Sequence, residues 1–154
     1  METLTREEAL DILATEPVAH LGMISNGAPY VTPMSFVVAD ERVRFRTMAG
    51  RKLDAIRDNP AVAIEVSRYD DDTGAWVSVI VEGQARLVED DQSRQETIAL
   101  LFAKYEKVIG SPLSGGGGLL PLGGHPYVIE VPIDRVTGMT SGRGMRVRTK
   151  PGRM

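Results

Sequence analysis

Several residue types are absent or scarce in this chain of 154 residues, and each absence removes a class of function. There is no cysteine, so the chain can form neither a disulfide framework nor a thiolate metal site or nucleophile. Only two histidines are present, His20 and His125, which argues against a metal centre built from several histidines. No run approaches the roughly 18 apolar residues of a membrane span, and the acidic start of the chain does not resemble a signal peptide. We therefore expect a cytoplasmic protein with no metal site and no membrane partner.

The remaining composition is that of one globular domain. Apolar residues make up 42% of the chain and charged residues 25%, which favours a packed core over disorder. No repeat or domain boundary is evident, so we expect one domain over residues 1–142, followed by a basic tail over 143–154. The tail has little aromatic interleaving for stacking on bases, and the protein is acidic overall. No nucleic-acid partner is therefore expected.

Three segments carry helical signals. Thr5 and Glu8 have capping-box spacing ahead of apolar residues at helical intervals, which predicts a helix over about 5–15. Residues 50–60, "GRKLDAIRDNP", are typical of a short helix ended by Asn-Pro. Residues 91–109 again place apolar side chains at helical spacing and predict a longer helix.

Strand signals fill most of the remaining chain. Asn26-Gly27 is the strongest hairpin signal, because both residue types tolerate positive φ. Pro33, in the return strand over 30–40, removes a ladder donor and so predicts an edge, a bulge or a ligand site. Gly83 predicts a bulge that bends a long strand over 75–88. Strands joined by hairpins and carrying two or three helices favour an antiparallel barrel of the α+β class.

The charge distribution is locally inverted around a short Thr-Met-Ala-Gly turn. Residues 42–60 contain six cations and two carboxylates, in a chain whose net charge is −3. A strand ending at Thr47 leads there into a helix that opens with Arg51 and Lys52. A helix N-terminus offers free N–H groups to a phosphate, Arg adds bidentate hydrogen bonds and Lys a mobile charge. The pattern predicts a phosphate site, while a solvated strand and helix face fits the same spacing equally well.

Other candidate sites carry weaker signals. The tetraglycine at 115–118 lacks the preceding strand and the following Lys-Ser/Thr of a P-loop, so we expect a flexible loop or a lid. His20 fits a structural role in a strand; His125 lies beside the glycine-rich loop, where contact with a ligand is the lesser alternative. No nucleophile elbow is present. We name no catalytic residue and expect catalysis to depend on a bound organic cofactor.

The order of motifs between residues 20 and 90 resembles the pyridoxamine 5′-phosphate oxidase-like superfamily of flavin-binding split barrels. The segments that carry the resemblance are "GAPYVTPMSFV", "RVRFRTMAGRKLDAIRDNPAVAIEV" and "WVSVIVEGQARLVED". The resemblance implies an α+β fold, a six-stranded antiparallel split β-barrel with two or three flanking helices. It also implies a homodimer with two flavin sites at the subunit interface.

The same resemblance implies which residues bind the cofactor. The strand matching Thr32–Val37 would lie along the isoalloxazine ring and give it backbone hydrogen bonds. The positions matching Arg46 and Thr47 would contact the ribityl-phosphate arm, and those matching Arg51 and Lys52 would neutralise the phosphate. Ser78 would approach the ring or the ribityl chain from another strand. The expected cofactor-binding residues are Thr32, Pro33, Met34, Ser35, Phe36, Arg46, Thr47, Arg51, Lys52 and Ser78.

The function implied is that of an FMN-dependent oxidoreductase acting on a small-molecule substrate. The substrate-binding Arg-Leu-His element of the true pyridoxamine phosphate oxidases has no counterpart in "MTSGRGMRVRTKPGRM", so oxidation of vitamin B6 is not expected. One alternative is a reductase that uses the deazaflavin coenzyme F-420, whose longer acidic tail would bind Arg44, Arg57 and the C-terminal arginines. Another is a non-catalytic protein that carries haem or flavin, with His20 or His125 as the nitrogen ligand.

Overall fold

The computed structural model describes residues 1–109 and 126–142 as three helices and ten strands in two sheets. The elements are β1 Glu2–Thr3, α1 Arg6–Thr15, β2 Ala19–Ser25, β3 Ala28–Met34, β4 Val37–Ala39, β5 Arg42–Thr47, α2 Arg51–Asp58, β6 Ala61–Tyr69, β7 Trp76–Gln84, β8 Arg86–Leu87, α3 Asp91–Ile109, β9 Tyr127–Pro132 and β10 Arg135–Thr140. The predicted tetraglycine loop, His125 and the basic tail lie outside the described residues.

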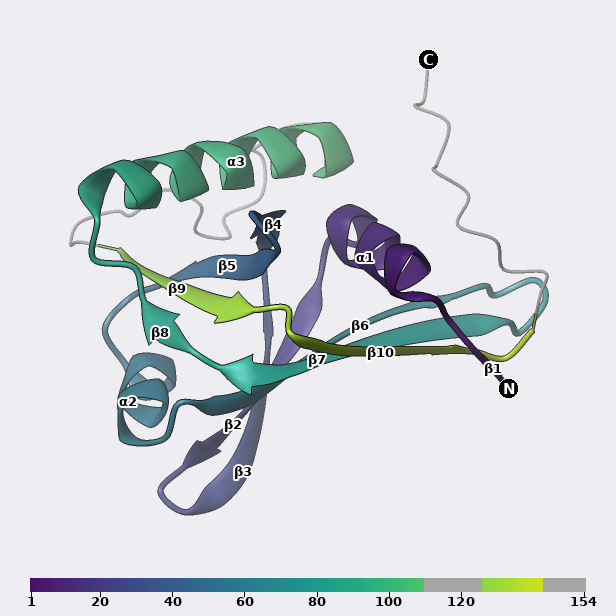
Figure 1. The fold of residues 1–154 in the computed structure, drawn as a ribbon, viewed down its shortest axis with the longest axis horizontal. Coiled ribbons are helices and arrows are strands. Elements are labelled where there is room, and N and C mark those ends of the chain that lie inside the picture. Colours follow the sequence, from purple (N-terminus) through teal and green to yellow (C-terminus); the bar gives the residue numbers. More distant parts are fainter. Residues whose placement is uncertain (110–125, 143–154) are drawn as a thin grey trace.

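Both sheets are antiparallel, which confirms the predicted α+β class and split-barrel architecture. The larger sheet has six strands in the order β1-β10-β7-β6-β2-β3, and the smaller has four in the order β4-β5-β9-β8. Figure 1 shows α1 over the long strands of the larger sheet, α3 over the smaller sheet, and α2 beside the β2–β3 hairpin. No helix within the described residues has both the length and the apolar character needed to cross a membrane.

Local signals in the sequence set the ends of most elements. Thr5 caps α1 and exchanges hydrogen bonds with Glu8, as the capping-box spacing predicts. Asn26 and Gly27 take φ values of 51° and 76° in the β2–β3 turn, which confirms the predicted hairpin. Pro33 lies in β3, an edge strand of the larger sheet, which is one of the places where proline is tolerated in a sheet.

Two long strands predicted from the sequence each divide between the sheets. The return strand over 30–40 becomes β3 in the larger sheet and β4 in the smaller one, and the strand over 75–88 becomes β7 and β8. Gly83 lies next to the second division and opposite the end of β9. A Cβ atom on Gly83 would lie 3.1 Å from Val131 Cγ1 and 3.2 Å from the Pro132 carbonyl oxygen. Glycine therefore permits the close approach of the two sheets at this corner.

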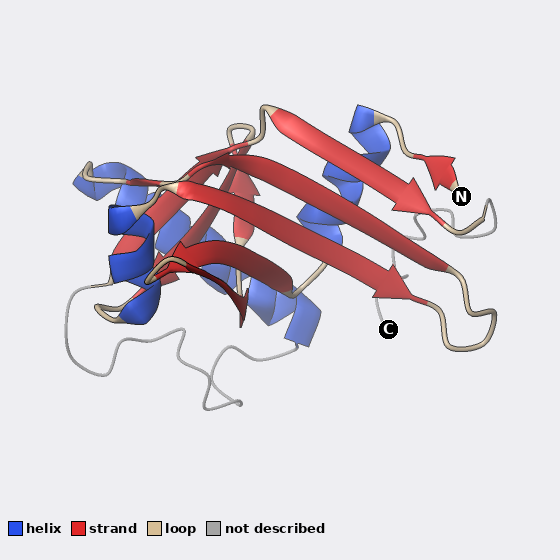
Figure 2. Cartoon of the chain, turned by 90° about the horizontal axis from the view of Figure 1, so that it is seen from below, coloured by secondary structure: helices blue, strands red, loops and turns tan. Residues whose placement is uncertain are grey.

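Alternating side chains give the larger sheet one buried face and one open face. The residues of β6 and β7 that point inward are fully or almost fully buried and pack with Ile12 and Leu13 of α1: Val62, Ile64, Val66, Val77, Val79 and Val81. The opposite face carries Val31, Ile80 and Met139, which are 63%, 40% and 41% exposed. In Figure 2 the long strands lie in front of α1, with this second face toward the viewer.

Candidate functional site

The junction between β5 and α2 presents an uncapped helix N-terminus. β5 ends at Thr47 and α2 begins at Arg51, as the sequence predicts. Gly50 precedes the helix with φ 157° and ψ −165°, a backbone conformation that is essentially restricted to glycine. Within residues 1–109 and 126–142 no side chain caps α2, so in this part of the chain the N–H groups of its first turn are left to bind an anion.

The six cations of the basic segment 42–60 have two different environments. Arg44 donates from Nε to Glu130 on β9 at 3.2 Å, and Arg42 donates from Nη1 to the same carboxylate at 3.4 Å. Arg86 on β8 completes the cluster at 2.6 Å. Arg44 is also buried and lies 3.5 Å from the Thr97 hydroxyl of α3. These arginines hold β5, β8 and β9 together, so their positive charge is used within the fold.

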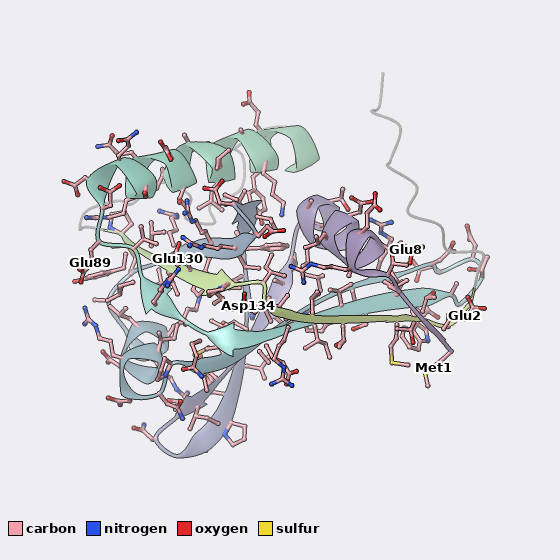
Figure 3. The ribbon with its side chains drawn as sticks, in the orientation of Figure 1. Met1, Glu2, Glu8, Glu89, Glu130 and Asp134 are labelled. Atoms are coloured by element: carbon pink, nitrogen blue, oxygen red, sulfur yellow. The ribbon has the colours of Figure 1, made fainter. Side chains whose placement is uncertain are left out.

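Glu130 is the centre of this cluster, and Figure 3 shows it on β9 among nitrogen-bearing side chains. Burial by itself would raise the pKa of its carboxyl group. The hydrogen bond from Arg86 and the positive charges of Arg42, Arg86 and Arg44 outweigh burial and lower that pKa below its ordinary value. Glu130 is therefore ionised over the physiological range and pairs with its arginines.

The other four cations have no such partner. No carboxylate of the described residues lies within 4.0 Å of a nitrogen of Arg46, Arg51, Lys52 or Arg57. Burial lowers the pKa of Arg46 and of Lys52, with no compensating negative charge. The positive charges of these partly desolvated cations and of the nearby helix N-terminus are not neutralised by the described residues. A bound anion would neutralise them.

Arg51 is fixed by contacts with the β2–β3 hairpin. Its Nε donates to Ser25 Oγ at 3.0 Å, and its Cζ lies 3.7 Å from the centre of the Tyr30 ring. Lys52 extends past Phe45, with Nζ 5.9 Å from that ring centre. Since Tyr30 belongs to β3, the strand predicted to contact the flavin ring lies against the helix predicted to bind the phosphate.

The segment predicted to contact the ring alternates between exposed and buried positions. Thr32 is partly buried, Pro33 and Ser35 are exposed, and the side chains of Met34 and Phe36 are buried. Phe36 is placed in the core, with both backbone groups bound to α3: its N–H donates to the Tyr105 hydroxyl at 2.9 Å, and its carbonyl accepts from Lys104 Nζ at 3.0 Å. The backbone left to bind a ligand is therefore that of residues 32–35, before the chain enters β4.

Ser78 lies apart from the other predicted residues. It is on β7, which β6 and β2 separate from β3, and three strand spacings amount to roughly 14 Å. Its hydroxyl donates to Glu65 Oε1 at 3.1 Å, and Glu65 Oε2 lies 3.1 Å from His20 Nδ1. His20, Glu65 and Ser78 thus form a hydrogen-bonded row across three strands on the open face of the larger sheet.

Sequence reasoning missed the partners that orient these groups. The burial of Ser25 could have been predicted, because it follows Ala19, Leu21 and Met23 at alternate positions of β2, which all point inward. Its hydroxyl therefore lies at a buried position. Glu65 and Tyr105 had none, since their partners lie 45 and 69 residues away in the chain.

Two hollows of the described surface lie away from the β5–α2 junction. One of about 330 Å³ separates the start of α1 from β10, and one of about 690 Å³ separates α3 from β4 and β5. Neither is lined by one of the ten residues predicted to bind the flavin, although the larger one includes Arg44, which the deazaflavin alternative invokes. Neither hollow therefore coincides with the candidate site at the β5–α2 junction.

Comparison with known sequences identifies relatives over most of the chain. The sequence pattern of the pyridoxamine 5′-phosphate oxidase family matches residues 5–111. An uncharacterized protein of Rhizobium meliloti strain 1021 is 27% identical over 84 residues, which are 54% of this chain and 55% of that protein. The chain thus matches about half the length of this curated relative.

Comparison with solved structures gives the same fold. An FAD-binding protein from Mycobacterium smegmatis is 26% identical with a TM-score of 0.66, covering 90% of this chain and 98% of that one. An FAD-binding protein from Mesorhizobium loti is 22% identical with a TM-score of 0.70, covering 90% and 95%. An FAD- and haem-binding protein from Mycobacterium smegmatis is 18% identical with a TM-score of 0.66, covering 90% and 72%. The last two likenesses are to the fold alone.

Proposed function

The chain belongs to the pyridoxamine 5′-phosphate oxidase family, and from that premise we propose that it is a flavin-dependent oxidoreductase that binds the cofactor phosphate at the β5–α2 junction. The observation that carries the proposal is that Arg46, Arg51 and Lys52, beside the N-terminus of α2, have no carboxylate partner among the described residues. A phosphate there would pair with all of these groups at once.

The residues present fit a flavin nucleotide. Arg51, Lys52 and the first N–H groups of α2 would bind the phosphate, with Arg46 and Thr47 beside the ribityl arm. β3 is an edge strand, so part of its backbone has no strand partner and can hydrogen-bond a ring along residues 32–35. A bound flavin supplies hydride transfer; the chain's own groups bind it, orient it and place hydrogen-bond donors beside it.

We also propose that the protein is a homodimer in which a second copy covers the open face of the larger sheet. That face carries three exposed apolar side chains, Val31, Ile80 and Met139, set among the polar groups of His20, Glu65 and Ser78, and the proposed partner would bury them. A second copy would also explain how an open surface becomes an enclosed cofactor site. It would bring in groups such as Ser78, which lies roughly 14 Å from β3 within one chain.

The decisive experiment compares the wild-type chain with the double variant Arg51→Ala, Lys52→Ala. We expect the wild type to bind flavin mononucleotide with the visible spectrum of a flavoprotein. The double variant should bind it at least about 100-fold more weakly, because two charge-assisted contacts of about 1.5 kcal/mol or more each are lost. Arg57→Ala is the control, since this cation lies at the far end of α2 against Tyr127.

Two results would count against the proposal. One is a wild-type protein that stays colourless when flavin is added. The other is a double variant that retains wild-type affinity, because the phosphate would then bind elsewhere.

The form of the cofactor is decided by comparing affinities for FMN, FAD and the deazaflavin coenzyme F-420. FMN is the form predicted from the sequence, while two similar structures bind FAD. The deazaflavin alternative relied on Arg44 as part of a groove for the longer acidic tail. Arg44 is buried against Glu130, so this alternative keeps only Arg57 among the described cations it invoked, and we favour a true flavin.

A second candidate function, haem binding, is favoured by the environment of His20. A carboxylate only accepts hydrogen bonds, so the contact with Glu65 places a proton on His20 Nδ1, and in the neutral imidazole the lone pair is then on Nε2. That is the form in which histidine binds haem iron. A Soret band that appears with added haemin and is lost in His20→Ala, but kept in His125→Ala, would establish this function. Its absence from the wild type would exclude it.

A further inference from the structure

The guanidinium of Arg51 is held in place before any ligand binds. Its flat face lies on the Tyr30 ring, with Cζ 3.7 Å from the ring centre, and its Nε–H is donated to Ser25 Oγ at 3.0 Å. Ser25 ends β2 and Tyr30 lies in β3, on either side of the Asn26–Gly27 turn. A tight hairpin thus supplies both contacts to Arg51, the first residue of α2. Figure 1 shows this hairpin beside α2.

These two contacts use a specific part of the side chain. A guanidinium has five N–H donors in a fixed plane, one on Nε and four on the two Nη nitrogens. Ser25 accepts the hydrogen bond from the Nε donor, and the Tyr30 ring covers one face of the guanidinium. The Nη edge keeps its donors, and no carboxylate of the described residues lies within ion-pair distance of it. The Nη edge is the part of arginine that binds two phosphate oxygens together.

The two neighbours of Arg51 are themselves held in place by the fold. Ser25 is buried, although it is polar, and its hydroxyl lies at an inward position of β2 where only a partner such as Arg51 can satisfy it. Tyr30 is half-buried and packs against the main core. Both groups therefore have little freedom to move away from Arg51. A side chain so constrained loses less rotamer entropy on binding than a free arginine does.

We propose that Ser25 and Tyr30 are positioning residues that orient Arg51 to receive the ribityl 5′-phosphate, the group that FMN and FAD share. This inference rests on the proposed flavin function and adds the residues that give the phosphate site its selectivity. It predicts that the side chains of Ser25 and Tyr30 contribute to recognition of the phosphate and not to recognition of the ring.

The test uses a readout that a purely structural contact would not change. Riboflavin has the ring and ribityl chain of FMN but no phosphate. The ratio of the riboflavin Kd to the FMN Kd therefore isolates the phosphate contribution. A loosened fold weakens both ligands alike and leaves the ratio constant, whereas a misplaced Arg51 lowers the ratio alone.

Both dissociation constants would be measured by flavin fluorescence on the full chain. The variants are Arg51→Ala, Tyr30→Leu, Tyr30→Phe and Ser25→Ala, with Tyr69→Leu on the exposed end of β6 as the control. We expect Arg51→Ala to lower the ratio the most. Tyr30→Leu and Ser25→Ala should each lower it about three- to tenfold, with the riboflavin Kd within about twofold of wild type. Tyr30→Phe keeps the ring and should keep the ratio, as should Tyr69→Leu.

The failures are distinguishable. If the wild type prefers FMN strongly and Tyr30→Leu and Ser25→Ala leave the ratio unchanged, the inference is wrong and the flavin function stands. If Tyr30→Leu does not fold, Ser25→Ala alone decides between these outcomes. Equal wild-type affinity for FMN and riboflavin removes the phosphate site and the inference with it. A wild type that binds neither flavin overturns the proposed function as well.

Discussion

At the scale of single residues, the residues opposite Arg44 and Arg46 on β9 decide which of these two arginines forms an ion pair within the described part of the chain. Arg44 and Arg46 point to the same side of β5. In the sheet register Arg44 lies opposite Glu130, whereas Arg46 lies opposite Val128. The first arginine therefore has a carboxylate partner and the second does not. The residue that lies opposite on β9, Glu130 or Val128, thus decides whether the arginine has a structural role or is a candidate binding residue.

Replacement of Glu130 should show how much the fold depends on this ion cluster. Glu130→Gln removes the buried counter-ion of Arg44 and leaves only the exposed Asp40, 4.0 Å away, so we expect the free energy of unfolding at pH 7 to fall by about 2–4 kcal/mol. Glu82→Gln is the control, because its partner Arg135 and its own side chain are largely exposed, and it should cost less than about 0.5 kcal/mol. Urea unfolding measures both. Equal losses of unfolding free energy in the two variants would show that the buried cluster stabilises the fold no more than an exposed ion pair does.

The same carboxylate predicts a pH dependence. The pKa of Glu130 is lower in the folded protein than its ordinary value of 4.5, so the folded state favours the ionised form. This contribution to stability is fully present above pH 4.5 and is lost as the pH falls below it through the folded pKa. The stability difference between wild type and Glu130→Gln should therefore shrink on acidification. A difference that stays constant down to pH 3 would contradict this assignment.

At the scale of secondary-structure elements, α3 fixes the joint between the two sheets. Tyr105 accepts from the Phe36 N–H at 2.9 Å and donates to the Pro17 carbonyl at 2.6 Å. One hydroxyl thereby connects α3 to the β3–β4 joint and to the segment after α1. The end of β3, the strand predicted to contact the cofactor, is thus fixed by a helix that sequence reasoning treated only as an amphipathic element.

Tyr105→Phe removes the hydroxyl and leaves the buried Phe36 N–H without its acceptor. We expect a loss of about 1–3 kcal/mol in the free energy of unfolding, and faster hydrogen exchange at the Phe36 amide than in the wild type. Tyr69→Phe serves as the matched control, because Tyr69 is 64% exposed. Unchanged exchange at Phe36 would show that another group satisfies the amide.

At the scale of the whole molecule, the open face of the larger sheet sets the expected assembly. Ile80 is 40% exposed near the middle of β7 and lies opposite Glu65 of β6 in the sheet register. The proposed homodimer would bury it.

Ile80→Glu should therefore convert the dimer to monomers, because a charge replaces apolar surface that the partner buries. Flavin binding should weaken along with dimerisation, since the proposed site lies at the interface. Leu100→Glu on α3, equally exposed at 41%, should change neither property. Sedimentation velocity with absorbance detection at a flavin wavelength follows both together. A wild-type monomer that binds flavin stoichiometrically would refute the interface.

Local features of this protein were predictable because they depend on neighbours in the chain. The cap at Thr5, the turn at Asn26-Gly27 and the ranges of α2 and α3 each follow from a few adjacent residues. For Pro33 the sequence left an edge, a bulge or a ligand site open, and the sheet order places it in an edge strand. So does the charge inversion at 42–60, which marks a candidate phosphate site in the sequence itself.

The tertiary structure alone decided which charges remain available and where each strand changes sheet. Arg44 meets Glu130 across 86 residues and Arg51 meets Ser25 across 26 residues, and no local pattern encodes such pairings. The divisions after Met34 and after Gln84 likewise depend on which strand lies alongside. The physical reason is the same in each case: hydrogen bonds and ion pairs form between groups that are close in space, and only the packed core determines which distant segments meet.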